Sequence, residues 1–141
     1  LYCGVGSLGI YMADRCKRVV GIELIAEAIV DAKKNAELNE LSNTDFVVGQ
    51  VEMLLDPAFV AKHGKPDVVI TDPPRAGMHP DVIKHLLAAA PQRIVYVSCN
   101  PATQARDLKM LSDSYTVITA IPVDMFPHTH HIECVALLEL K

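Results

Sequence analysis

The stretch Arg93-Ile-Val-Tyr-Val-Ser-Cys-Asn-Pro-Ala-Thr103 decides how the rest of the chain is interpreted. Ile94 to Val97 form an apolar, β-rich run, which is typical of a strand in a sheet covered on both faces. Asn100-Pro101 ends this strand, because proline has no backbone donor and disfavours a helical conformation in the preceding residue. From Pro101 onward the pattern predicts a helix. Cys99 therefore lies at the carboxyl end of a strand, the edge where ligands bind in open α/β sheets.

The position of Cys99 favours a reactive thiol. It lies near the positive end of the predicted helix, and Arg106 follows about one turn into that helix. Both features stabilise a thiolate, which is the state that a nucleophile needs. A packing role is the alternative, because unpaired cysteines are often buried as small apolar residues.

Composition restricts the class of protein. The chain has 141 residues, of which 50% are hydrophobic, as expected for one globular domain with a substantial core. Its net charge of -4 is unlike that of a stand-alone nucleic-acid binder, so an RNA substrate would need contacts from elsewhere. The four cysteines form no C-x-x-C pair, which argues against a zinc ribbon or a disulfide framework and favours a reducing cytoplasm. No apolar run reaches membrane-spanning length, so no membrane partner is expected.

The first residues predict a nucleotide-binding turn. Leu1-Tyr2 resembles the end of a strand whose beginning is absent, which indicates a fragment of a longer protein. Gly4 permits a tight turn and Gly6 lets the backbone approach a ligand closely. The spacing Gly4-x-Gly6-x-x-Gly9 matches the dinucleotide fingerprint, but a plain strand-to-helix turn has the same spacing.

Polar residues end the next two predicted strands. Glu23 ends the strand that starts at Arg18 and lies about 20 residues after the first glycine, where Rossmann-like sites hold a ribose diol. Both NAD and S-adenosylmethionine carry such a ribose. Alternatively, Glu23 caps the helix predicted over 26–38. Gln50 ends the strand that starts at Thr44 and can pair with an adenine edge, although an exposed amide at a strand end is ordinary.

Asp67-Val-Val-Ile-Thr-Asp-Pro-Pro-Arg-Ala-Gly77 predicts a fourth strand and its exit loop. Before it, 53–63 is predicted as a helix broken at Asp56-Pro57. Asp72 ends the strand, and Pro73-Pro74 holds the chain extended while leaving carbonyls free to accept from a ligand. Arg75 follows on a rigid loop, so a functional role for this segment is favoured.

The carboxyl-terminal part predicts a hairpin. Tyr115–Val123 and Ile132–Leu140 are expected to be antiparallel neighbours, because the connection is too short for a crossover helix. The loop 124–131 holds three histidines whose spacing matches no zinc-ligand set, so a substrate-facing loop is favoured over a metal site. Glu133, at the start of the last strand, is either an edge carboxylate or a base near the crevice.

Four motifs together resemble one family. They are Leu1-Tyr-Cys-Gly-Val-Gly6, Asp72-Pro-Pro-Arg-x-Gly77, Ser98-Cys-Asn-Pro-x-Thr103 and Asp124-Met-Phe-Pro-x-Thr-x-His-x-Glu133. The family is that of the S-adenosylmethionine-dependent RNA 5-methyluridine methyltransferases, with a lean toward the 23S ribosomal-RNA members over the transfer-RNA ones.

The resemblance implies an α/β class I, Rossmann-like methyltransferase fold. Its sheet is mostly parallel, ends in an antiparallel hairpin and here lacks most of the first strand. Residues 1–141 would be the catalytic domain, without the upstream RNA-binding portion. Whether an upstream iron-sulfur cluster exists is unknown.

The resemblance also assigns roles. Cys99 would be the nucleophile and Glu133 the base that removes the C5 proton. The residues implied to bind S-adenosylmethionine are Tyr2, Gly4, Gly6, Ser7, Glu23, Gln50 and Asp72. Those expected to contact RNA are Pro73, Arg75, Arg106 and His130. At two of the cofactor positions, Ser7 and Gln50, other members often carry asparagine or an acidic residue.

Three other functions are weighed against this one. Amino-group methyltransferases share Asp72-Pro73-Pro74, but an aromatic follows where this chain has Arg75, and they need no thiol. An NAD-binding module is supported only by the glycine spacing. A non-catalytic remnant that binds cofactor or RNA is the third.

Overall fold

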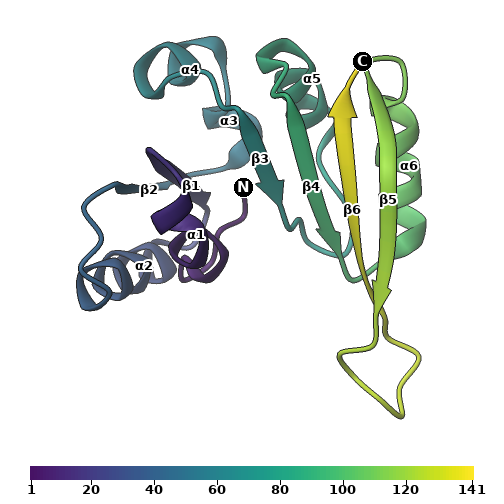
Figure 1. Ribbon diagram of the computed structural model, residues 1–141, viewed down its shortest axis with the longest axis horizontal. Coiled ribbons are helices and arrows are strands. Elements are labelled where there is room, and N and C mark those ends of the chain that lie inside the picture. Colours follow the sequence, from purple (N-terminus) through teal and green to yellow (C-terminus); the bar gives the residue numbers. More distant parts are fainter. The chain divides into compact units, whose positions relative to one another are not determined.

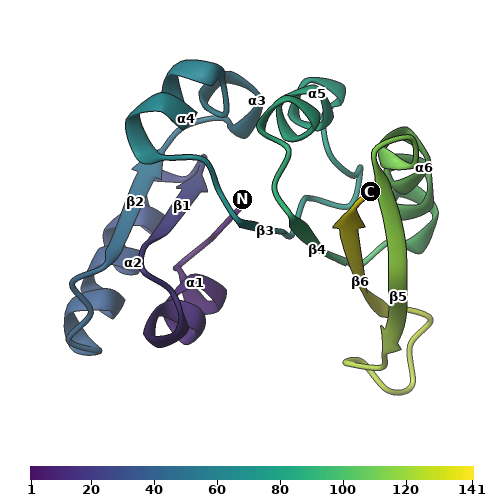
Figure 2. The ribbon, with the colours of Figure 1, turned by 45° about the horizontal axis from the view of Figure 1, so that its top comes forward.

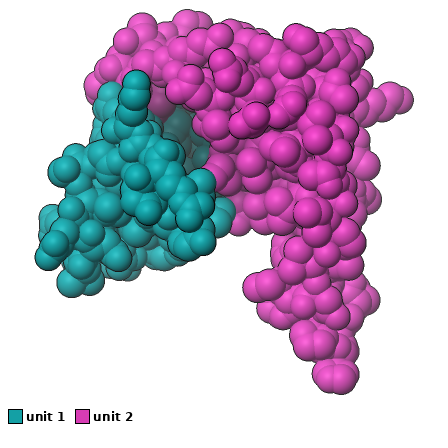
Figure 3. Space-filling model, viewed as in Figure 1, with its two compact units in different colours: residues 1–54 teal, residues 55–141 magenta.

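The computed structural model describes residues 1–141 and divides them into two compact units, Leu1–Leu54 and Leu55–Lys141 (Figure 3). The boundary falls between α3 (Val51–Leu54) and α4 (Pro57–His63), where the sequence predicts one broken helix. The break is complete, because the Asp56 carboxylate accepts a hydrogen bond of 2.7 Å from Phe59 N and caps a new helix. Length and composition alone predict one domain and do not reveal this division.

The first unit is a small α/β layer. It comprises α1 (Ser7–Met12), the 3-10 turn η1 (Ala13–Arg15), β1 (Val19–Glu23), α2 (Ala26–Leu38), β2 (Thr44–Val48) and α3. The two strands are parallel neighbours, with Val19 opposite Thr44 and Glu23 opposite Val48. The predicted helix 26–38 is confirmed as α2, whose Ile29, Ala32 and Ala36 are spaced to share one face. They pack on Phe46 of β2 and form the core of this unit. The helix α2 lies against the strand β2 (Figure 2).

The second unit contains a four-stranded sheet in the order β3-β4-β6-β5. Its elements after α4 are β3 (Val68–Thr71), α5 (Pro80–Ala89), β4 (Arg93–Ser98), α6 (Pro101–Leu111), β5 (Tyr115–Val123) and β6 (Glu133–Leu140). β3 and β4 are parallel, whereas β6 runs antiparallel to both β4 and β5 (Figure 1). The predicted hairpin is thus confirmed, and β6 lies between β4 and β5.

The strands form two sheets, whereas the sequence predicts one. β1 and β2 make a separate parallel pair. Cys3 N donates a 3.0 Å hydrogen bond to Ile22 O of β1, but Leu1 to Cys3 form no strand. This segment therefore belongs to neither sheet.

β4 has two different faces. Ile94, Tyr96 and Ser98 are buried, whereas Val95 and Val97 are half-buried. Tyr96 faces α6, because its hydroxyl donates to Asp107 of that helix. Successive strand residues point to opposite faces, so Val97 faces away from α6. The predicted complete burial on both faces is therefore wrong for the second face.

None of the helices combines the length and the apolar character needed to cross a bilayer.

Candidate active site

A pocket of about 340 Å³ in the second unit is lined by three of the predicted site residues, Asp72, Cys99 and Glu133. It is lined by Asp72, Val97, Cys99, Val123, Met125, Phe126, Glu133 and Val135. The pocket thus combines one thiol and two carboxylates with an apolar lining.

The sheet topology explains why the three functional side chains meet. Asp72 and Cys99 each follow one of two adjacent parallel strands, β3 and β4, so both lie at the same edge. Glu133 is the first residue of β6, which runs antiparallel to β4 with Cys134 opposite Ser98. The amino end of β6 therefore lies beside the carboxyl end of β4, where Cys99 follows.

Local hydrogen bonds hold the turn that carries Cys99. The buried Ser98 hydroxyl accepts from Asn100 N at 3.0 Å and donates to Asn100 O at 3.1 Å. The Asn100 side chain then caps α6 by accepting from Ala102 N at 3.1 Å. Cys99 is half-buried and forms no disulfide. The expected position between strand and helix is confirmed.

Arg106 contacts residues other than Cys99. Its guanidinium donates to the Asp107 carboxylate at 2.7 and 2.9 Å and to Ala76 O at 3.0 Å. It is absent from the pocket lining. The expected stabilisation of the thiolate by Arg106 therefore lacks structural support, because this side chain already has an anionic partner. Its contact with RNA stays a prediction.

Asp72 titrates at a shifted pH. Although this residue is exposed, partial desolvation at the pocket and then the negative charge of Glu133 raise the pKa of its carboxyl above the ordinary value. The charge of Glu133 thus disfavours the ionised form of Asp72.

Asp72→Asn is expected to raise the melting temperature slightly near pH 7. Because the pKa of Asp72 is higher in the folded state than in the unfolded state, the folded protein holds this proton more tightly. The resulting contribution to stability is present below the ordinary pKa and is lost as the pH rises through the folded-state pKa. The increase in melting temperature should therefore vanish in acid, where Asp72 is protonated in both the folded and the unfolded protein. Thermal melts from acidic to neutral pH measure it, with the exposed Asp113→Asn as control for removing one charge. A gain that persisted unchanged in acid would contradict this explanation.

Glu23 organises the glycine-rich turn in the first unit. Its Oε2 accepts from Gly4 N and its Oε1 from Ile25 N, both at 3.0 Å. The second bond ends at Ile25, directly before α2, and this helix has no side-chain cap hydrogen bond, so the capping alternative is not supported. No side chain lies within 4 Å of a Cβ built at Gly4, so the backbone is open there to a ligand. A Cβ at Gly6 would lie 3.0 to 3.2 Å from Phe46, Ile10 and Ala32, so packing also requires glycine.

Three other predicted cofactor residues lie in the same unit, whereas Asp72 belongs to the second unit. Tyr2 is half-buried with a φ of 56°, and Ser7 is exposed at the first position of α1. Gln50 is exposed between β2 and α3. Their roles toward a cofactor stay predictions.

The predicted substrate residues are spread over the second unit. Pro73 is buried, and Arg75 is exposed on the loop after β3. His130 is exposed in the hairpin loop, where its ring lies 4.3 Å from that of His131. The structure contains no group of three or more His, Cys, Asp or Glu side chains arranged to hold a metal ion.

Sequence reasoning did not single out Met125 and Phe126 as pocket residues. They are 61% and 52% exposed, which is unusual for such large apolar side chains. Their place directly after a strand and beside a proline was the available signal. The hairpin loop that carries them extends past the end of the sheet (Figure 1).

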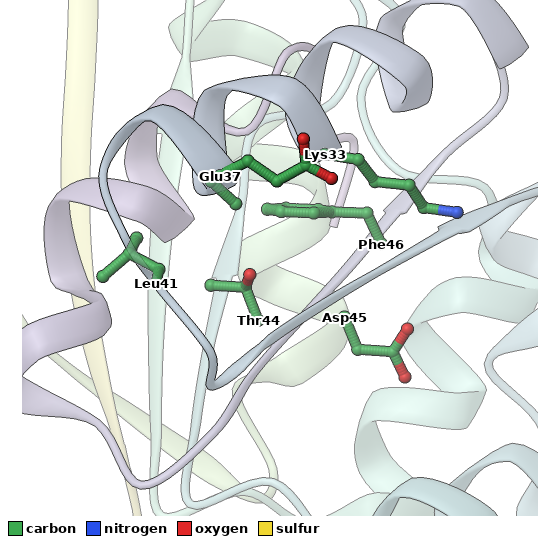
Figure 4. Close-up of a pocket in the computed structure, with 7 residues that line it drawn as sticks. Lys33, Glu37, Leu41, Thr44, Asp45 and Phe46 are labelled. Carbon is green, nitrogen blue, oxygen red and sulfur yellow. The ribbon is translucent and has the colours of Figure 1, made fainter.

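A second hollow, of about 250 Å³, lies between α2 and β2 in the first unit (Figure 4). It is lined by Lys33, Ala36, Glu37, Leu41, Thr44, Asp45 and Phe46. None of these is a predicted site residue.

Solved structures define the class of this fold. The chain superposes with a TM-score of 0.84 on a Pyrococcus abyssi tRNA (uracil-54, C5)-methyltransferase in complex with S-adenosyl-L-homocysteine, with 44% identity over 97% of this chain and 32% of that one. An rRNA methylase from Streptococcus thermophilus shares the fold at a TM-score of 0.75 but only 13% identity, over 98% of this chain and 82% of that one. The fold is that of the class I S-adenosylmethionine-dependent methyltransferases, as predicted.

The family model for tRNA (Uracil-5-)-methyltransferase matches residues 1–141, and the chain belongs to this family. A Bacteroides thetaiotaomicron protein described as an uncharacterized RNA methyltransferase is 56% identical over all of this chain and 31% of its own length. A similarly described protein of Oceanobacillus iheyensis is 50% identical over 99% of this chain and 30% of its own length. The chain thus spans about a third of these relatives.

Proposed function

We propose that the protein methylates carbon 5 of a uridine in RNA, through a covalent bond between Cys99 and the base. The observation that carries the proposal is the presence of Cys99 and Glu133 in one pocket. Membership of the uracil-5 family supports the same reaction. An amino-group methyltransferase needs neither a thiol nor a second carboxylate in this position.

The first unit fits S-adenosylmethionine as the cofactor. The backbone at Gly4 is open to a ligand, and Glu23 is held by two backbone donors where a ribose diol is expected. The Pyrococcus abyssi relative, solved with S-adenosyl-L-homocysteine, supports this cofactor over NAD. When bound, it supplies an electrophilic methyl group.

The pocket residues supply the remaining chemistry. Carbon 5 of uracil is too weak a nucleophile to accept a methyl group unaided. The Cys99 thiolate adds to carbon 6, which breaks the C5–C6 double bond and moves its electrons into an enolate. Carbon 5 then bonds to the methyl group, whose bond to the sulfonium sulfur would break with its electron pair remaining on that sulfur. Glu133 removes the C5 proton, the S–C6 bond breaks with its electrons returning to sulfur, and the double bond re-forms.

The target must be unstacked to enter such a pocket, which favours a uridine in a single-stranded loop. The motifs favour ribosomal RNA, whereas the Pyrococcus abyssi relative is named for transfer RNA. We propose rRNA as the substrate and tRNA as the second candidate. Maps of 5-methyluridine in both RNAs, with and without the gene, test the choice. A map unchanged in every RNA would contradict the proposed activity.

Phe126→Ala is expected to raise KM for RNA about tenfold, because an exposed aromatic that lines the pocket can stack on an unpaired base. Methylation at varied RNA concentrations measures it. Ile118→Ala is the matched control, since Ile118 lies on the same hairpin and is also 52% exposed but does not line the pocket. Equal effects of the two substitutions would contradict a stacking role.

A further inference from the structure

Helix α6 presents polar side chains along one face to the loop that leaves β3. We call residues Asp72–Met78 the exit loop. Asn100 Nδ2 donates to Arg75 O at 3.2 Å, and the Thr103 hydroxyl, with one proton to donate, lies 3.1 Å from both Arg75 O and Asn100 O. Arg106 donates to Ala76 O at 3.0 Å. The three side chains are spaced by one helical turn each, so they lie on one face and hold the loop by its backbone.

Asp107 is the centre of these contacts. It is 0% exposed and accepts hydrogen bonds of 2.7 Å from both Met78 N and the Tyr96 hydroxyl. Its other oxygen accepts two bonds from Arg106. Burial, and then the hydrogen bond to Asp107, raise the pKa of Tyr96 far above its usual value, so this hydroxyl remains a donor. One buried carboxylate therefore joins the exit loop, β4 and α6.

Gly77 shows how closely the exit loop approaches α6. A Cβ at this position would lie 2.6 Å from both Arg106 Nη2 and Asp107 Oδ2 and 3.2 Å from Thr103 Cβ. Gly77 also has a φ of 84°, a conformation that side chains disfavour. The chain therefore has glycine where the loop backbone meets the carboxylate.

The contacts have a consequence for the pocket. The exit loop begins with Asp72, and α6 begins directly after the turn that carries Cys99. Pro73-Pro74 restricts the backbone between Asp72 and the residues held by α6. The separation between Asp72 and Cys99 thus depends on how the loop is held.

We propose that Asp107 is a positioning residue that, with Arg106 and Tyr96, clamps the exit loop on α6 and fixes Asp72 relative to Cys99. The catalytic part of this inference rests on the proposed function. Asp107 touches no substrate. It acts by limiting the positions of the pocket side chains, and small misplacements of reacting groups cost large factors in rate.

Asp107→Asn tests the clamp, because it keeps the size of the side chain and removes the charge that Arg106 binds. Leu111→Val is the matched control: Leu111 is fully buried on the same helix, and its apolar side chain can make no hydrogen bond to the exit loop. Both variants are made in the whole protein, and their melting temperatures are compared. Tyr96→Phe removes only one hydrogen bond from Asp107. It should therefore lower the melting temperature less than Asp107→Asn does.

Two readouts separate positioning from general destabilisation. Hydrogen exchange of peptides covering 72–78 should become about tenfold faster in Asp107→Asn. Single-turnover adduct formation with 5-fluorouridine RNA should slow by about tenfold to a hundredfold, with RNA affinity within about twofold of wild type. Leu111→Val should change neither readout by more than about twofold at the same temperature.

The clamp would be overturned if Asp107→Asn left hydrogen exchange of residues 72–78 unchanged. It would also be overturned if Leu111→Val accelerated this exchange as much as Asp107→Asn does. Faster exchange without slower adduct formation would overturn its role in positioning Cys99 and Asp72. A wild-type protein that forms no adduct would instead overturn the proposed function, while the exchange measurement would still decide whether the loop is clamped.

Discussion

Cys99→Ala is expected to lower methylation by about 10⁴-fold or more and to abolish the covalent complex with 5-fluorouridine RNA. Without the thiol, carbon 6 of the base receives no nucleophile, so carbon 5 is not activated. Fluorine at carbon 5 cannot leave as a cation, so the wild-type adduct should persist after methyl transfer. Denaturing gels and mass spectrometry of the whole protein with cofactor and RNA measure both effects.

Cys16→Ala is the matched control for Cys99, since Cys16 is also a free thiol and is exposed. The Cys16→Ala protein should form the covalent complex with 5-fluorouridine RNA and methylate RNA at the wild-type rate. Persistence of the adduct in Cys99→Ala, or its loss in Cys16→Ala, would contradict the assignment of the nucleophile.

Glu133→Gln is expected to slow turnover by about 10² to 10⁴-fold and to accumulate an adduct with ordinary uridine RNA. The amide cannot accept the C5 proton, so the methylated base stays bonded to Cys99. This outcome distinguishes a base from a residue that binds substrate, whose loss would reduce adduct formation. The adduct is measured by mass spectrometry, with the methyl group as a mass increment on the trapped base.

Glu139→Gln is the control for Glu133. Both carboxylates lie on β6, but Glu139 pairs with Arg93 at 2.9 Å at the other end of the strand and does not line the pocket. This exposed pair contributes little stability, so the variant should behave as wild type. A Glu133→Gln protein with less adduct than wild type would argue that Glu133 assists an earlier step.

Much of the site was predictable because its signals are local. The strand before Cys99 follows from an apolar β-rich run, and its end follows from Asn100-Pro101, whose cap and missing donor act within a few residues. The bounds of α2 follow in the same way from helical composition and spacing.

Side-chain partners were less predictable, since they depend on residues distant in the chain. Arg106 is near Cys99 in sequence, yet its guanidinium binds Asp107 and the carbonyl of Ala76. No periodicity indicated that a buried Asp107 would accept from Met78 N. The exposed Met125 and Phe126 are likewise recognised as pocket residues only once the hairpin is folded.

The sequence by itself predicted most of the strands and helices, the turn that carries Cys99 and the family motifs, because backbone sterics and side-chain periodicity act over short distances. Tertiary structure decided which of these ends share a pocket. Insertion of β6 antiparallel beside β4 brings Glu133 to the edge where Cys99 lies, and docking on α6 holds the loop that begins with Asp72. Both arrangements depend on hydrogen bonds between segments far apart in the chain, which local pattern does not encode.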